Sequence, residues 1–209
     1  GANTVGNLTK VTELDSSVAE YTYDDLYRLT DEVRTGTGAY TKSYGYDLAG
    51  NVTTLDGASF ASYSNVNKIS SLASGTIGYD NDGNTTSLNA FGFGSGTISW
   101  TNDNKISSSG GGTYTYDAYR RRVVRRIGSN PRTIYIFSGS KLIGEIYNNS
   151  ASVAYTWGPD GLVSERLLTG TAKSLWYSFG PQGETRQLTS SSGTVVDSYR
   201  YTGYGVPTS

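Results

Sequence analysis

The 209-residue sequence contains no cysteine, no histidine and no methionine, and only 4 prolines. Without cysteine, the chain forms neither a disulfide framework nor a thiolate metal site. Without histidine, it lacks the usual general base near neutral pH and the commonest metal ligand. These absences weigh against an enzyme and against a bound metal or other cofactor.

The charges nearly cancel, because 17 basic residues stand against 18 acidic ones. A domain that binds nucleic acid carries a broad positive field, so we expect no nucleic-acid partner. No apolar run approaches the ~20 residues of a membrane-spanning helix, and no charged and then apolar leader opens the chain. A chain that begins GANTVGNLTK is expected to be cut from something longer, so any secretion signal would lie outside it.

Glycine and tyrosine are abundant, with 27 and 18 residues, while hydrophobic residues make up only 35%. Leucine, isoleucine and valine are therefore scarce, and tyrosine must contribute much of the burial. Aromatic and β-branched residues suit the half-buried surface of a pleated sheet. The composition favours strands joined by turns.

A short repeat organises the whole chain. Its clearest copies are YTYDDLYRLT from Tyr21, YGYDLAGNVT from Tyr44, IGYDNDGNTT from Ile77 and YTYDAYRRRV from Tyr114. Alignment on the aromatic residue before the aspartate extends the series to about ten repeats, spaced by roughly 16 to 23 residues. We call these aromatic residues anchors: Tyr23, Tyr46, Tyr63, Tyr79, Trp100, Tyr116, Phe137, Trp157, Phe179 and Tyr201.

The columns around the anchor predict a β-hairpin. The residue two places earlier is large in nearly every repeat, as in Tyr21, Tyr44 and Tyr114, and residues two apart lie on the same face of a strand. Four places after the anchor the chain has mostly glycine or asparagine, as at Gly50 and Gly83, which adopt positive φ most easily.

The aspartate after the anchor is interpreted as a turn residue. A carboxylate in this position accepts hydrogen bonds from backbone N–H groups inside the turn. The strongest repeats have it at four positions: Asp24, Asp47, Asp80 and Asp117.

The pattern Y-x-Y-D-x-x-G-[RN]-[LV]-T resembles the YD repeats of RHS proteins, a bacterial family similar in turn to the extracellular region of teneurins. The stretch from YTYDAYRRRVVRRIG onward resembles the segment that leads into the RHS-associated core. The resemblance implies an all-β fold in which tandem hairpins form a curved, spiralling antiparallel sheet, like part of a shell or solenoid. It also implies secretion or a cell-surface location, and a C-terminal toxin cargo in many members.

We expect one repeat array over residues 1–209, with YD repeats in 1–110 and repeats approaching the core in 111–209. The expected partners are adjoining YD repeats of the same polypeptide or neighbouring copies of the chain, because strand edges at the ends would otherwise stay unpaired. The family's self-cleavage motif is not present in the sequence, so no catalytic residue is carried over.

Three tryptophans are candidates for stacking on glycans: Trp100, Trp157 and Trp176. The competing interpretation, which we favour, is that the aromatic columns form the packing layer of the sheet. A dense basic run, which includes Arg120, Arg122 and Arg125, is either an anion-binding patch or a set of structural cation–π and ion-pair partners; the structural use is favoured.

Two acidic features also have both a functional and a structural interpretation. The segment DNDGN at Asp80 resembles the start of a calcium loop, but its glycine is misplaced for an EF-hand, so a turn is favoured. The acid pairs Asp24-Asp25 and Asp31-Glu32 are adjacent along strands, so their side chains point to opposite faces and do not converge as a glycosidase requires.

The sequence thus predicts a non-catalytic wall that encloses or presents a C-terminal toxin. The alternative is a cell-surface adhesin or filament component that binds glycans.

Overall fold

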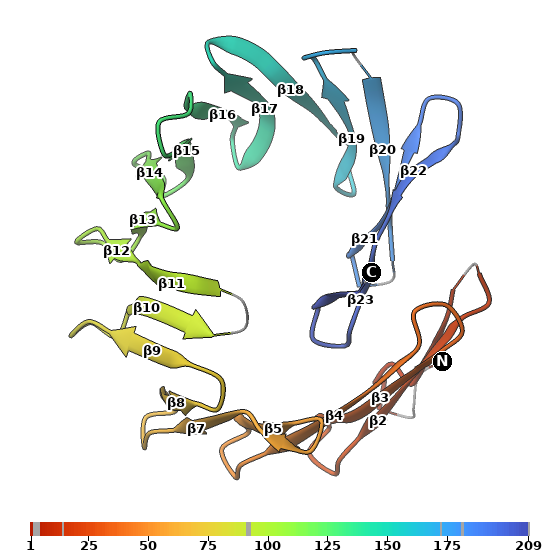
Figure 1. Cartoon of the computed structure of the whole chain (residues 1–209). Helices are drawn as coiled ribbons and strands as arrows, with labels where there is room; N and C mark the ends of the chain where they lie inside the picture. Colours follow the sequence, from red (N-terminus) through yellow and green to blue (C-terminus); the bar gives the residue numbers. More distant parts are fainter. Residues whose placement is uncertain (2–4, 14, 91–92, 172, 181, 209) are drawn as a thin grey trace. The chain divides into compact units, whose positions relative to one another are not determined.

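The computed structural model describes residues 1, 5–13, 15–90, 93–171, 173–180 and 182–208. Every regular element among these residues is a β-strand, 24 in all, and the strands pair in antiparallel fashion. Neighbouring strands are joined by short turns in chain order (Figure 1). The predicted all-β architecture of tandem antiparallel hairpins is confirmed. No described segment is a helix that could cross a membrane.

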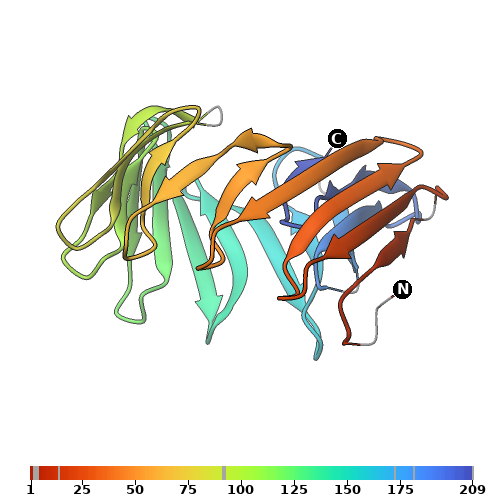
Figure 2. The same cartoon turned by 90° about the horizontal axis from the view of Figure 1, so that it is seen from below.

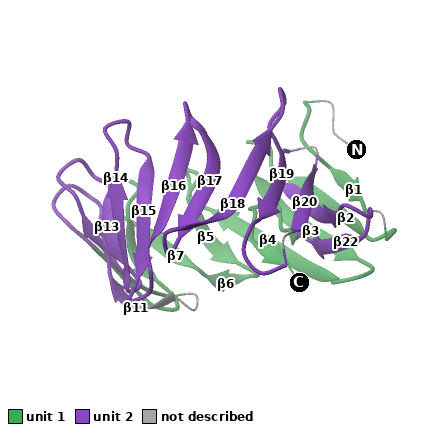
Figure 3. Ribbon diagram, turned by 90° about the horizontal axis from the view of Figure 1, so that it is seen from above, with its two compact units in different colours: residues 1–78, 88–95, 200–209 green, residues 79–87, 96–199 purple. Residues whose placement is uncertain are grey.

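The chain forms two compact units, coloured separately in Figure 3. Unit 1 contains residues 1–78, 88–95 and 200–209, and unit 2 contains residues 79–87 and 96–199. The last residues of the chain therefore belong to the unit that the first residues build.

Unit 1 contains a six-stranded sheet in which strand order follows chain order (Figure 2). Its strands are β1 (Lys10–Thr12), β2 (Val18–Tyr23), β3 (Leu29–Thr35), β4 (Tyr40–Tyr46), β5 (Val52–Leu55) and β6 (Ala58–Ser59). Two separate hairpins complete it: β7 (Ala61–Tyr63) with β8 (Ile69–Leu72), and β23 (Arg200–Tyr201) with β24 (Pro207–Thr208).

Unit 2 contains an eleven-stranded sheet, also in chain order. Its strands are β12 (Ser99–Trp100), β13 (Ile106–Ser109), β14 (Gly112–Tyr116), β15 (Arg122–Ile127), β16 (Thr133–Ser138), β17 (Lys141–Tyr147), β18 (Ser150–Trp157), β19 (Leu162–Leu167), β20 (Lys173–Phe179), β21 (Thr185–Ser190) and β22 (Val195–Ser198). The division between the units falls within the three-stranded sheet of β9 (Thr76–Tyr79), β10 (Thr85–Ala90) and β11 (Phe93–Thr97).

Most hairpins turn in the same way. The anchor pairs with the residue six places later, as Tyr23 does with Leu29, whereas Phe137 and Trp157 pair five places later; the strand register shifts just before the anchor. Except after Phe137, the residue four places after the anchor has positive φ, for example 88° at Gly50 and 85° at Gly83. Glycine enters this region without steric cost, whereas Tyr27 (φ 62°) and Arg120 (φ 66°) occupy it as L-residues. The hairpin at Phe137 has a shorter turn, because Ser138 already pairs with Lys141.

Burial is thin, as expected for a chain with few aliphatic residues. In unit 1, one cluster forms around Ala61, Leu72 and Ala90, with partly buried aromatic and aliphatic side chains packed against it. In unit 2, Leu175 and Leu188 are buried, at 4% and 7% exposure. Most anchors are half-buried, so the aromatic layer supplies much of the packing itself.

Candidate functional site

The turn aspartates organise the hairpin loops. Oδ1 of Asp24 accepts hydrogen bonds from the backbone N–H groups of Leu26 and Arg28, each at 2.9 Å. The same pair of bonds is made by the other three turn aspartates, Asp47, Asp80 and Asp117, at 2.8 to 3.0 Å.

The second oxygen of each turn aspartate is bonded to the side chain of the residue five places after the anchor. Arg28 donates its Nε–H to Asp24 at 2.7 Å, and Asn51 donates its amide to Asp47 at 2.9 Å. Side-chain and backbone hydrogen bonds from Asn51 lower the pKa of Asp47, so its carboxylate is ionised at neutral pH. The segment around Asp80 forms such a turn, and the described residues contain no cluster of three or more potential metal ligands.

The same arginine and asparagine side chains also reach forward to the next turn. Arg28 donates to the backbone carbonyl of Asp47 at 3.0 Å. Asn51 donates to the side chain of Asn67 at 3.1 Å, and Arg121 donates to the backbone carbonyl of Gly139. Consecutive turns are therefore linked along one edge of each sheet.

The anchors reach backward to the preceding hairpin. Tyr46 donates its hydroxyl hydrogen to the carbonyl of Leu29 at 2.5 Å, and Tyr116 donates to the carbonyl of Ile106 at 2.9 Å. Tyr23 and Tyr63 do the same, so each such bond requires an aromatic body with a polar hydrogen, which the anchors Phe137 and Phe179 lack.

This requirement accounts for two of the three tryptophans. The indole N–H of Trp100 donates to the carbonyl of Thr85 at 2.8 Å, and that of Trp157 donates to the carbonyl of Leu142 at 2.6 Å. Both rings are half-buried, and Nζ of Lys141 lies 5.6 Å from the centroid of the Trp157 ring. Trp176 is not an anchor and is 38% exposed.

The remaining repeat residues lie on the strands or at the turns, as their types predict. Tyr21, Tyr44, Tyr79 and Tyr114 are half-buried on strands, whereas Gly50 and Gly83 are exposed at turns. In three hairpins without the aspartate a hydroxyl replaces it, as when Lys105 donates its backbone N–H to Oγ1 of Thr101 at 3.1 Å, whereas Gly158 and Gly180 follow two other anchors.

The basic run is distributed over several contacts. The guanidinium of Arg122 lies 5.4 Å from the centroid of the Tyr114 ring and 5.5 Å from that of Tyr135. Arg121 is bonded to Asp117 and lies over the ring of Phe137 at 4.8 Å. A shallow cavity of about 340 Å³ is lined by Arg121, Arg122, Tyr135, Phe137 and Leu142.

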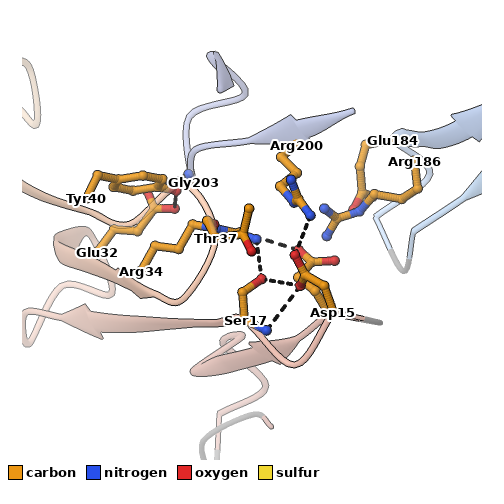
Figure 4. Close-up of polar contacts among 11 residues, drawn as sticks. Asp15, Ser17, Glu32, Arg34, Thr37, Tyr40, Glu184, Arg186, Arg200 and Gly203 are labelled. Carbon is orange, nitrogen blue, oxygen red and sulfur yellow. Dashed lines mark hydrogen bonds and ion pairs between the residues drawn. The ribbon is translucent and has the colours of Figure 1, made fainter. Parts of the chain in front are cut away.

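The last hairpin of the chain docks on the first sheet of unit 1 (Figure 4). Glu32 is fully buried, at 0% exposure, and accepts a hydrogen bond from the Tyr40 hydroxyl. Its other oxygen accepts the backbone N–H of Gly203 at 2.7 Å. Next to this turn, Tyr204 packs edge-on against Tyr44, with ring centroids 4.8 Å apart. We call this contact of residues 200–208 the clasp.

An ion pair holds the other side of the clasp (Figure 4). Arg200 donates to Oδ2 of Asp15 at 2.6 Å. Hydrogen bonds from the Ser17 side chain and backbone, together with the charge of Arg200, lower the pKa of Asp15 to about 2. Ser17 is itself fixed by the buried Arg34, whose guanidinium donates to Oγ at 2.6 Å.

Sequence reasoning did not single out Glu32, Asp15 or Arg200. Glu32 was considered only as half of an acidic pair, although its place opposite Tyr21 follows from the repeat register. The repeat register could therefore have indicated that Glu32 faces Tyr21. No sequence pattern indicates the hydrogen bond between Glu32 and Gly203, because it joins residues 171 positions apart.

The structure is a series of antiparallel hairpins. Turn side chains bond to the next hairpin and aromatic donors bond to the previous one, an arrangement that defines a class of β-hairpin wall proteins. Residues 3–206 match the family described as teneurin YD-shell. The chain belongs to the teneurin YD-shell family, which confirms the predicted YD-repeat resemblance.

Similar solved structures come from toxin complexes. One, a TcdB2–TccC3–Cdc42 complex, is 14% identical with a TM-score of 0.59, over 100% of this chain and 16% of that one. Another, a Tc holotoxin pore of Photorhabdus luminescens, is 12% identical with a TM-score of 0.53, over 100% of this chain and 15% of that one. At these identities the likeness shows the fold alone.

Among curated proteins, the chain is 29% identical over 219 residues to the tRNA3(Ser)-specific nuclease WapA of Bacillus spizizenii. The match covers 98% of this chain but only 8% of WapA. The chain therefore corresponds to a small part of this much longer relative.

Proposed function

We propose that the chain is a non-catalytic wall segment of a secreted YD-repeat protein, and that this wall encloses or presents a toxin or effector carried by the same polypeptide. The observation that carries the proposal is the two-way linkage of the hairpins. Turn side chains such as Arg28 reach the next hairpin, and tyrosine and tryptophan anchors such as Tyr46 reach the previous one. Such a sheet acts by partitioning space.

Membership in a YD-shell family and likeness to structures from toxin complexes support this role and a bacterial, secreted setting. We do not extend the nuclease activity of WapA to this chain, because the match covers 8% of that protein. The chain also has no histidine to act as a general base.

Protection of the cargo tests the proposal. In the full polypeptide, we expect the cargo segment to resist limited proteolysis, and a Tyr46→Ala/Tyr63→Ala variant to expose it. The matched control is Leu48→Ala, because Leu48 is fully exposed in the same hairpin as Tyr46. Equal cleavage of the cargo in the wild type and the wall variant would refute shielding, and a hydrolase activity lost on mutating a single acidic residue would refute the non-catalytic role.

The glycan-binding adhesin is the second candidate, and Trp176 is the residue that favours it, because its side chain is 38% exposed and is not an anchor. The indoles of Trp100 and Trp157 are used in structural hydrogen bonds. A glycan array would test this function. If the chain binds a glycan and Trp176→Ala binds it equally well, the tryptophans do not contact the glycan. If the chain binds no glycan, the adhesin function is refuted.

A further inference from the structure

One repeat position distinguishes two kinds of hairpin. In three hairpins, the residue paired with the first aromatic is glutamate: Tyr21 with Glu32, Tyr135 with Glu145, and Tyr155 with Glu165. In three others the residue at this position is leucine: Leu55 opposite Tyr44, Leu188 opposite Tyr177, and Leu72 opposite Ala61, which replaces the first aromatic.

A second position changes with the first. In each glutamate hairpin, the residue paired with the anchor is leucine: Leu29, Leu142 and Leu162. In each leucine hairpin it is β-branched: Val52, Ile69 and Thr185. The glutamate hairpins thus share the motif Leu-x-x-Glu on the returning strand, and both residues face a pair of aromatic rings.

The first of these three sites is occupied in the structure. Glu32 accepts the Tyr40 hydroxyl with one oxygen and the backbone N–H of Gly203 with the other, at 2.7 Å. A Cβ on Gly203 would lie 2.6 Å from Cδ2 of Leu29 and 3.4 Å from Oε2 of Glu32. The two residues of the motif therefore contact the same point of the docked turn, and they select a glycine there.

The other two sites have the same leucine and glutamate with nothing docked on them, and the tyrosine that donates to each glutamate is the first aromatic of the next hairpin. Glu145 accepts the Tyr155 hydroxyl at 2.9 Å, and Glu165 accepts the Tyr177 hydroxyl at 2.8 Å, each through one oxygen. No described residue donates to the second oxygen of either carboxylate, and both side chains are half-buried where Glu32 is fully buried. Burial, followed by the hydrogen bonds to these carboxylates, raises the pKa of both tyrosines, so they remain donors at neutral pH.

We propose that the Leu142–Glu145 and Leu162–Glu165 sites are docking sites for glycine-bearing hairpin turns of the Thr-Gly-Tyr type, supplied by further YD repeats of the polypeptide. The backbone N–H of the turn donates to the free carboxylate oxygen, and the glycine allows close approach to the leucine. This assignment rests on the proposed wall function, and it adds a contact by which one part of the wall holds another. Among the repeats of this chain, the turn of Thr202–Tyr204 has such a glycine, and it already occupies the Glu32 site.

A synthetic peptide with the sequence of residues 199–208, YRYTGYGVPT, is the probe. We expect it to bind the full 209-residue chain at two sites, because Glu32 is engaged by the chain's own clasp. The same peptide with valine at the position of Gly203 should bind about tenfold more weakly or worse, since the valine side chain prevents the charge-assisted bond.

Glu145→Leu and Glu165→Leu introduce the residue that other hairpins already have at this position. Each single variant should lose one binding site and the double variant both, while Asp82→Asn, which removes an exposed charge from the β9–β10 turn of unit 2, should bind like the wild type. Hydrogen exchange on the wild-type chain gives a readout that needs no variant: the peptide should protect β17–β20.

Three results would overturn the proposal: no binding, equal binding of the valine peptide, or protection confined to strands outside β17–β20. None of them would alter the protection of the cargo from proteolysis, so failure of the docking site is distinguishable from failure of the wall function.

Discussion

Replacing Gly50 by alanine isolates the cost of the left-handed turn residue. Gly50 has φ 88°, and a Cβ built on it meets no atom within 4 Å. Alanine would therefore lose nothing to steric contact, and the whole effect would come from the backbone. An L-residue in this region costs about 1–2 kcal/mol, partly offset by the lower chain entropy of unfolded alanine, ~0.5–1 kcal/mol.

We therefore expect Gly50→Ala to destabilise the chain by about 1 kcal/mol, which corresponds to a fall in Tm of about 2–4 °C for a domain of this size. Gly50→Asn should cost less, because asparagine tolerates this conformation better than alanine does. Each hairpin contacts mainly its neighbours, so hydrogen exchange at the amides of β4 and β5 should accompany the thermal measurement.

The reciprocal change at the same repeat position is Tyr27→Gly. Tyr27 has φ 62° and is 60% exposed, so little packing is lost with its ring. We expect a neutral to stabilising effect of up to about 1 kcal/mol. A Gly50→Ala variant as stable as the wild type, or a Tyr27→Gly variant destabilised by more than about 1 kcal/mol, would refute the assignment of strain to this position.

Three further predictions follow from the contacts. Tyr46→Phe should lower the free energy of unfolding in urea by about 0.5–1.5 kcal/mol for each hydrogen bond lost, because the hydroxyl bonds to the carbonyl of Leu29 and to the Tyr204 hydroxyl; an unchanged midpoint would contradict the anchor role. Burial raises the pKa of Tyr44 to about 12, above the ~10 of an unfolded tyrosine, so stability should be complete below pH ~10 and fall as the pH rises toward 12. The pKa of Asp15 is lowered to about 2, so the ion pair of the clasp should persist above pH ~4 and weaken as the pH falls toward 2. Hydrogen exchange in residues 200–208 would measure that loss, and Arg200→Gln should reduce its pH dependence, because the ion pair with Asp15 is removed.

Much of the fold could be predicted from the sequence because the repeat is local. The aromatic pair, the turn aspartate and the glycine of YGYDLAGNVT lie within one hairpin, and their types follow from strand alternation and positive φ. The short turn at Phe137 was less accessible, because alignment places Lys141 at the turn position whereas the loop closes earlier, at Ser138.

The clasp could not be predicted, because its contacts are not local to one hairpin. Glu32 and Gly203 are ordinary residues in their own hairpins, and only the folded chain brings the carboxylate to the N–H. The hydrogen bonds from the anchors to the preceding hairpin were partly predictable. The repeat shows the aromatic residue that donates, but the acceptor is a backbone carbonyl, which the sequence does not reveal.

The use of a backbone carbonyl as the acceptor affects how much the sequences of such chains can differ. A carbonyl is supplied by every amino acid, so the acceptor at Leu29, Val52, Thr85 or Ile106 imposes no demand on its own side chain. Only the donor is constrained, and tyrosine and tryptophan both satisfy it. A substitution in one hairpin then requires no compensating change in the next. The same path of the backbone is therefore compatible with only 12–14% sequence identity, the level seen in the similar toxin-complex structures.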